Sequence, residues 1–114
     1  MQKAPIMDRE TFYANKQLKQ TVWWLMDCSF PDLQWARQCI FDDGSSDVCL
    51  DEGKEIHAFA KAEDAVHFLS EDEYVEVEDL LEASSDYPDM PADTGEPPVW
   101  PSHERQSFFY YESY

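Results

Sequence analysis

The sequence predicts an α+β fold with an N-terminal helix, a short antiparallel β-meander, one or two short acidic helices and an extended, Pro-rich, aromatic C-terminal arm. Three observations predict it: apolar residues with helical spacing in two stretches, strand-like alternation between those stretches, and prolines spread along the last part of the chain. With 114 residues, 43% of them hydrophobic and 15% aromatic, the chain has room for one modest core. We therefore expect a compact domain over residues 1–83 and the arm over residues 84–114.

The first predicted helix runs from about Asp8 to Met26. Asp8 is a suitable N-cap, and five later positions recur at three- and four-residue steps: Thr11, Ala14, Leu18, Val22 and Leu25. Pro31 then ends the helix, because proline disfavours helical backbone in the residue before it.

The middle of the chain predicts three antiparallel strands. Residues 33–41 alternate along a strand, with Leu33, Trp35, Arg37 and Cys39 on one face. The polar residues 42–46 predict a turn, and residues 48–50 the returning strand. A second turn at 51–54 leads to a third strand at 55–59.

Two short acidic helices are expected next. Apolar residues at 62, 65, 66 and 69 have helical spacing, and Ser70 to Glu73 has the form of a capping box for a second helix that reaches Leu81. The alternative is a strand over residues 73–78, with Val75 and Val77 facing inward. Helical spacing extends further along the chain and favours the helix.

From Ala83 to Glu104, prolines prevent a helix and predict an extended arm: Pro88, Pro91, Pro97, Pro98 and Pro101. An aromatic cluster follows in residues 108–114. Burying such a ring stabilises by about 1.5–3 kcal/mol. We expect the cluster either to fold back onto the meander or to anchor another chain.

Charge is the strongest signal in the sequence. The formal net charge is −17, and residues 62–104 contain fourteen acids with no Lys or Arg. Solubility of a small domain needs roughly 2 to 8 units, and the excess costs self-repulsion. Either the surface is simply over-acidic, or the charge serves an interaction.

Motifs for catalysis and metal binding are absent from the sequence. Cys28, Cys39, Cys49 and His57 contain no close pair of the kind that structural zinc sites use. Residues 42–47 resemble a calcium loop in composition alone, and no phosphate loop, nucleophile elbow or zinc-protease motif is present. We expect no metal, no cofactor and no enzymatic activity. A nucleophilic cysteine paired with His57, His67 or His103 is the alternative, and three inert thiols are favoured.

The chain is expected to be cytoplasmic. Three cysteines do not pair evenly, no apolar region follows the first residues, and the longest apolar run, Val22 to Met26, is far shorter than the roughly 20 residues of a membrane span. The negative charge should repel both anionic membranes and nucleic acid.

Carboxylates with helical spacing indicate a way to use the charge. On one helix, the pairs Asp72 and Glu76, and Glu78 and Glu82, would be displaced by about 6 Å along the axis, comparable to the step between phosphates along a DNA strand. The predicted partner-binding acids are Glu71, Asp72, Glu73, Glu76, Glu78, Asp79 and Glu82. The predicted aromatic anchors are Trp100, Phe108, Phe109 and Tyr111.

The leading hypothesis is an inhibitor that docks its acidic face on the basic nucleic-acid-binding surface of a partner protein. In size, charge and lack of a catalytic motif the chain is similar to phage-encoded nucleic-acid mimics that inhibit restriction or CRISPR systems, a likeness of composition that matches no residue motif. The alternatives are an immunity protein or antitoxin that covers a basic nuclease toxin, and a small assembly or adaptor protein. A linear array of acids would favour the mimic, and a compact cluster would favour the immunity protein.

Overall fold

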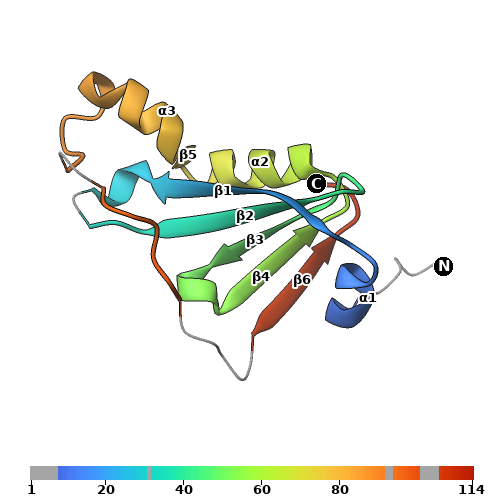
Figure 1. Cartoon of the computed structure of the whole chain (residues 1–114). Helices are drawn as coiled ribbons and strands as arrows, with labels where there is room; N and C mark the ends of the chain where they lie inside the picture. The colour runs from blue at the N-terminus through green and yellow to red at the C-terminus, as the bar shows by residue number, and fades with distance from the viewer. Residues whose placement is uncertain (1–7, 31, 92–93, 101–105) are drawn as a thin grey trace.

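The computed structural model describes residues 8–30, 32–91, 94–100 and 106–114. Its centre is a six-stranded sheet of strand order β5-β1-β2-β3-β4-β6 (Figure 1). The strands are β1 (Leu18–Met26), β2 (Trp35–Phe41), β3 (Ser46–Leu50), β4 (Glu55–Phe59), β5 (Tyr74–Glu76) and β6 (Ser107–Tyr111). The α-helices are α1 (Arg9–Tyr13), α2 (Ala62–Glu71) and α3 (Val77–Glu82), and the 3-10 turns are η1 (Asp27–Ser29), η2 (Asp51–Gly53) and η3 (Ser84–Asp86). The chain is therefore a mixed α+β domain.

The predicted meander is confirmed. β2, β3 and β4 pair antiparallel in sequence order, and the turns between them lie where the polar residues predicted them. Each turn contains a glycine in the left-handed region, Gly44 with φ 89° and Gly53 with φ 89°, where residues with a side chain are disfavoured. Trp35, Arg37 and Cys39 share one face of β2, because alternate residues of a strand point the same way.

The predicted helix from Asp8 to Met26 is wrong beyond Tyr13. Asp8 caps α1 as expected, with its Oδ1 accepting from the Thr11 amide at 2.8 Å, but Asn15 has φ 59° and turns the chain into β1. In the second half of β1 the adjacent residues Trp24 and Leu25 are both buried although they point to opposite faces of the sheet, so its apolar run from Val22 to Met26 also fitted helical spacing. Its central residues are also β-branched or aromatic, types that favour strands.

The second acidic region also differs from the prediction. The helix expected over residues 62–69 is confirmed as α2, but α2 continues through Ser70, which therefore caps nothing. The single helix expected from 70 to 81 is wrong: Glu73 has φ 64° and reverses the chain, β5 follows, and α3 begins at Val77. The segment thus contains both a strand, as the alternative predicted, and a helix. Pairing of β5 with β1 overrides the helical spacing of the β5 residues.

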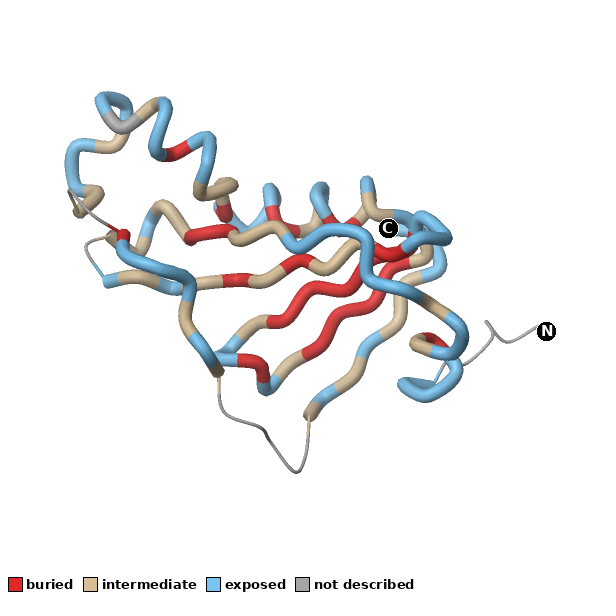
Figure 2. Tube along the Cα trace, viewed as in Figure 1, coloured by how far each residue is buried: buried red, intermediate tan, exposed pale blue. Residues whose placement is uncertain are grey.

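The core has two parts, and many of the buried residues lie along the central strands of the sheet (Figure 2). The larger lies between α2 and the sheet, and its buried residues are Trp24, Ala36, Val48, Phe59, Ala65, Leu69 and Tyr74. The smaller lies on the other face, where α1 inserts Phe12 against Phe41 and Ala58. No helix within the described residues is long and apolar enough to cross a membrane.

The aromatic C-terminal residues form β6, which pairs parallel with β4. Phe108 and Tyr110 contact the Phe12 cluster on one face, whereas Phe109 and Tyr111 lie on the α2 face beside His57. The sheet thus takes strands from both sides of residue 83, and the division of the chain at that residue stays a prediction. Residues 87–91 and 94–100 form no helix or strand, and Pro101 lies outside the described residues.

Candidate acidic binding surface

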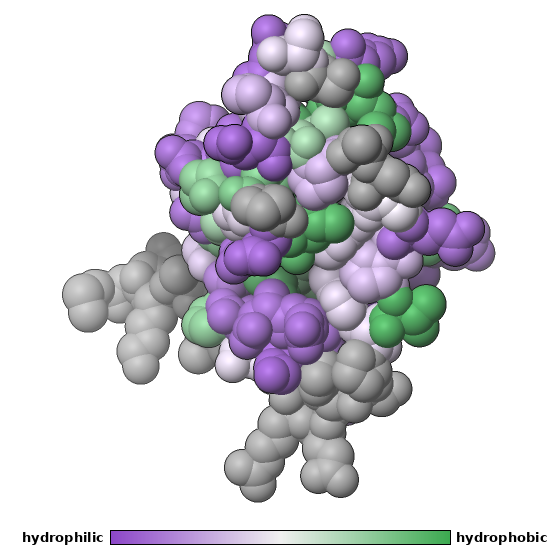
Figure 3. Space-filling model, turned by 90° about the vertical axis from the view of Figure 1, so that its left-hand side faces the viewer, coloured by the Kyte–Doolittle hydropathy of each residue, from purple (hydrophilic) through white to green (hydrophobic). Residues whose placement is uncertain are grey.

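The seven predicted partner-binding acids lie where α2 ends and β5 and α3 follow, at one end of the molecule (Figure 1). We call this surface the acidic end and define it as Glu71, Asp72, Glu73, Glu76, Glu78, Asp79 and Glu82. All of them are exposed except Glu76, which is half-buried. Figure 3 looks at this end and shows hydrophilic side chains over much of the view, with a few hydrophobic ones among them.

Two contacts hold the acidic end in place. The Asp27 amide of η1 donates to the Glu73 carbonyl at 3.0 Å, which continues the pairing of β5 with β1. Leu80 of α3 is fully buried, so α3 is fixed through its apolar side. The neighbouring acids Glu78 and Asp79 consequently face solvent in the first turn of α3, where the helix dipole favours negative charge.

The acids do not form the regular ladder that one helix would have given. Glu78 and Glu82 share α3, but Asp72 lies in the turn after α2 and Glu76 lies in β5. The expected 6 Å step is therefore wrong for Asp72 and Glu76. The carboxylates instead come together from the end of α2, from β5 and from α3.

These charges have almost no compensation within the described residues. Of the seven acids, Glu71 has an ion-pair partner among the described residues: the Tyr114 hydroxyl and the His67 Nε2, at 2.9 Å, contact it and lower its pKa. The other six form no ion pair in the part of the chain that the structure describes. Burial raises the pKa of Glu76, and the nearby Asp79 and Glu78 raise it further. The acidic end thus repels itself.

The predicted aromatic anchors are not grouped with the acids. Phe108, Phe109 and Tyr111 belong to β6, at the opposite edge of the sheet from β5. Phe108 lies 6.1 Å from Phe12 and Tyr111 lies 4.8 Å from Phe59, between ring centroids, so both make internal contacts. Phe109 stacks on His57 and remains 44% exposed.

Trp100 lies nearer to the acids. Its ring packs edge-on against Trp23 of β1, with centroids 5.3 Å apart, and the Arg37 guanidinium lies 5.6 Å from its centroid. Of the four predicted anchors, Trp100 is therefore the one placed on the β5–β1–β2 side of the sheet.

No pattern in the sequence grouped Asp27 and Cys28 with Glu73. The candidate ligand atoms of Asp27, Cys28 and Glu73 all lie within 4.8 Å of one another, and a hydrogen bond with Glu73 raises the pKa of Cys28. Exposed acids often gather in this way without an ion, so we assign no metal here. Glu73 lies 46 positions after Asp27 and 45 after Cys28 in the sequence. Pairing of β1 with β5, which no local pattern indicated, brings them together.

Among the described residues, Cys49 forms no site with the nearby His57. Cys49 pairs with Ile56, so the adjacent His57 projects from the opposite face of the sheet. Burial raises the pKa of Cys39 to about 12 and raises that of Cys49, which keeps both thiols protonated and poorly nucleophilic at neutral pH. His103 lies outside the described residues.

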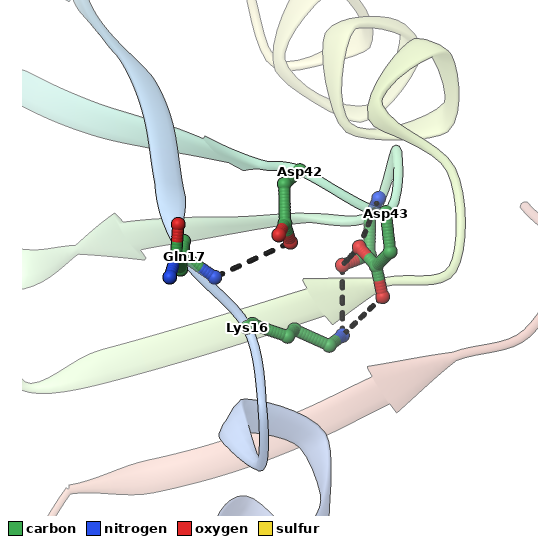
Figure 4. Close-up of polar contacts among 5 residues, drawn as sticks. Lys16, Gln17, Asp42 and Asp43 are labelled. Atoms are coloured by element: carbon green, nitrogen blue, oxygen red, sulfur yellow. Dashed lines mark hydrogen bonds and ion pairs between the residues drawn. The ribbon is translucent and has the colours of Figure 1, made fainter.

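The segment that resembled a calcium loop is a hairpin turn (Figure 4). Asp42 Oδ1 accepts from the Gln17 amide at 3.2 Å, and Asp43 accepts from the Ser45 amide at 2.9 Å. The Lys16 ammonium reaches the same turn, 3.4 Å from Asp43 Oδ2, and donates to Ser45 Oγ at 2.7 Å. These acids stabilise the junction between α1 and the hairpin.

In chemical terms, six of the seven carboxylates of the acidic end form no ion pair with a described cation. Such a surface attracts a cationic partner over several ångströms and raises the rate of encounter. A scan against protein-family models and searches of curated proteins and of solved structures each found no match.

Proposed function

We propose that this protein is an acidic inhibitor that binds the basic nucleic-acid-binding surface of a partner protein. One observation carries the proposal: six carboxylates of the acidic end have no ion-pair partner among the described residues. A surface of Lys and Arg that normally neutralises phosphates would neutralise these carboxylates instead. Occupation of that surface would exclude nucleic acid.

The energetic cost of the acidic end supports a functional role. Glu76 has a raised pKa, so its ionised form is disfavoured in the folded state. Selection for stability alone would replace such a residue, whereas functional sites commonly retain destabilising features. A bound cation would relieve this repulsion.

The finer proposal is a nucleic-acid mimic of the phage anti-restriction or anti-CRISPR kind. Its support is the size of the chain, 114 residues, and its net charge of −17. Because the acids come from several elements, the likeness to nucleic acid would be one of surface charge rather than of a regular phosphate spacing.

A second candidate is an immunity protein or antitoxin that covers the active site of a basic nuclease toxin. The observation that favours it is the convergence of carboxylates from α2, β5 and α3, which makes a compact group. A compact group suits a single catalytic site, whereas a long groove would require charges along a line.

The test is affinity capture from lysate of the native host, at low and at high salt, followed by elution with DNA or RNA. We expect a basic nucleic-acid-handling protein that is recovered mainly at low salt and released by nucleic acid, because exposed charge pairs are screened by salt. The triple variant Glu78→Gln, Asp79→Asn, Glu82→Gln should recover much less of it.

The matched control is the triple variant Glu10→Gln, Glu63→Gln, Glu112→Gln. These acids are exposed, and two of them lie in first helical turns, as Glu78 and Asp79 do. Equal losses from the two triple variants would show that only net charge matters and would contradict the proposal. Release by long duplexes but not by short ones would favour the mimic over the immunity protein.

A further inference from the structure

A cavity of about 660 Å³ opens beside the acidic end. Its walls come from the start of β2, from β5, from η2 and the first residue of β4, and from residues 98–100. This volume lies within the range of about 300–1,000 Å³ typical of ligand sites. Its lining includes acids and aromatic residues, among them Trp35, Asp51, Glu55, Tyr74 and Trp100. We call it the aromatic–acid pocket.

The pocket combines the two kinds of group that recognise organic cations. Aromatic faces attract ammonium and guanidinium groups, by about 0.5–2 kcal/mol for each contact. Carboxylates form charge-assisted hydrogen bonds with the same groups, and they match the planar fork of arginine best. No Lys, Arg or His is among the described residues that line the pocket. The described lining therefore supplies acids and aromatic rings, and Arg37, which is not a lining residue, contacts the Trp100 ring.

The walls of the pocket are held before any ligand binds. Trp35 and Trp100 both pack edge-on against Trp23, with ring centroids 5.8 and 5.3 Å away. The Asp51 carbonyl accepts from the Lys54 amide at 3.1 Å, and Glu55 Oε1 lies 3.2 Å from His57 Nε2. A site that is already ordered loses less entropy on binding.

Tyr74 connects the pocket to the acidic end. Its side chain is buried in the core under α2 and also lines the pocket. Burial raises its pKa, and the charges of Asp72 and Glu55 are among the groups that raise it further. An acid of the acidic end, Asp72, and an acid of the pocket, Glu55, thus both act on Tyr74.

We infer that the aromatic–acid pocket binds a guanidinium or ammonium group, and that its occupant is an arginine or lysine side chain that the partner inserts as an anchor. The inference rests on the proposed function for the identity of the occupant, because the partner surface is rich in these residues. Within this molecule, Arg37 already lies over Trp100, 5.6 Å from the ring centroid, so the same kind of contact forms where a guanidinium is available. An anchor in an ordered pocket is the usual source of most of the affinity of an interface.

The direct test is an NMR titration with N-acetyl-arginine amide, followed through the indole N–H signals of Trp35 and Trp100. The neutral analogue N-acetyl-citrulline amide has nearly the same shape and is the matched ligand. We expect saturable shifts with the arginine compound and at least about tenfold weaker binding of the citrulline compound. Equal binding of the two, or no saturable shift with either, would overturn the inference.

The pocket residues are tested with the double variant Asp51→Asn, Glu55→Gln. Asp51 has φ 52°, a conformation that asparagine tolerates, so the fold should persist, and dispersed amide signals would verify it. We expect at least about tenfold weaker binding of N-acetyl-arginine amide. The variant Glu10→Gln, Glu63→Gln loses the same charge elsewhere and should bind as the wild type does; an equal loss from both variants would contradict the assignment.

Capture of the partner separates this inference from the proposed function. If Asp51→Asn, Glu55→Gln weakens capture, the occupant is a partner side chain, as inferred. If the arginine compound binds but capture is unchanged in this variant, the pocket takes a free small cation and the assigned occupant is wrong. If Glu78→Gln, Asp79→Asn, Glu82→Gln leaves capture unchanged while Asp51→Asn, Glu55→Gln weakens it, the acidic end is not the interface. The proposed function then fails, and the inference about the pocket is supported.

Discussion

The α1 corner and the acidic end both contain carboxylates, but they use them differently. In the α1 corner, which we define as Tyr13, Lys16, Asp43, Ser45 and Asp47, each acid has a donor. Asp43 meets Lys16 and Ser45 (Figure 4), and the Tyr13 hydroxyl donates to Asp47 Oδ2 at 2.5 Å. At the acidic end, six of seven acids form no ion pair among the described residues.

The paired acids of the α1 corner contribute to the stability of the fold, whereas the acids of the acidic end are not needed for it. Lys16 is placed over the Phe12 ring, 3.5 Å from its centroid, so it connects the paired acids to the core. The acidic end is anchored instead by the apolar Leu80 and by strand pairing. Its carboxylates are therefore free to serve an interaction, and substitutions in the two regions should have opposite consequences.

The largest effect on stability is expected from Tyr13→Phe. Asp47 is 4% exposed and one of its oxygens already lacks a hydrogen-bond partner in the described structure. Removal of the Tyr13 hydroxyl would leave the second oxygen without its donor, at a cost of about 1–3 kcal/mol. Urea denaturation measures the free energy of unfolding.

Tyr110→Phe is the matched control. Tyr110 packs on the same Phe12 ring, with centroids 6.0 Å apart, but no hydrogen bond of its hydroxyl is found among the described residues. Its loss should change the free energy of unfolding by less than about 0.5 kcal/mol. Similar losses from the two variants would show that the bond to Asp47 is not what stabilises the corner.

Stability should first rise and then fall as the solution is acidified. The folded-state pKa values of Asp47 and Glu76 are raised above 3.8 and 4.5. Their ionised forms therefore destabilise the fold near neutral pH. Protonation removes this destabilisation as the pH falls through the raised pKa values. The pKa values of Asp43 and Glu71 are lowered from 3.8 and 4.5, so their contribution is lost at still lower pH. Thermal unfolding across this range should therefore show a maximum on the mildly acidic side.

Asp47→Asn checks the cause of that maximum. The amide oxygen can still accept from Tyr13, but no charge is buried, so the rise in stability below neutral pH should become smaller. A wild-type curve that falls steadily from neutral pH, or an unchanged rise in the variant, would contradict the assignment.

A smaller effect of opposite sign is expected from Glu76→Gln. Removal of its charge ends the cost of burying it and the repulsion with Asp79 and Glu78, so the free energy of unfolding should increase, by up to about 0.5 kcal/mol. Glu63→Gln is the control, because Glu63 lies in the first turn of α2, where the helix dipole favours its charge. That variant should lose a few tenths of a kcal/mol, and a loss from Glu76→Gln as well would refute the claim that the acidic end repels itself.

The parts of the fold that depend on local pattern were predictable. Turn residues and alternation marked the strands of the meander, and helical spacing marked α2. β1 was not predictable in this way, because it packs on both faces and its apolar residues fit a helix as well as a strand. β5 has only three residues and exists through its pairing with β1, a contact between distant parts of the chain.

The candidate site, too, was predictable only where it depends on local sequence pattern. The stretch of acids was visible in the sequence, and the structure gathers it at one end. The grouping of Asp27 with Glu73, the separation of Phe108 and Tyr111 from the acids, and the aromatic–acid pocket all depend on strand order, which local patterns do not contain.

The most direct test of the account is the salt dependence of partner affinity. The dissociation constant of the captured partner would be measured from low to high salt for the wild type and for the two triple variants, which lose the same charge. We predict that Glu78→Gln, Asp79→Asn, Glu82→Gln weakens binding and flattens the salt dependence, while Glu10→Gln, Glu63→Gln, Glu112→Gln keeps the wild-type slope. Identical slopes for all three proteins would contradict the claim that the acidic end binds a basic surface.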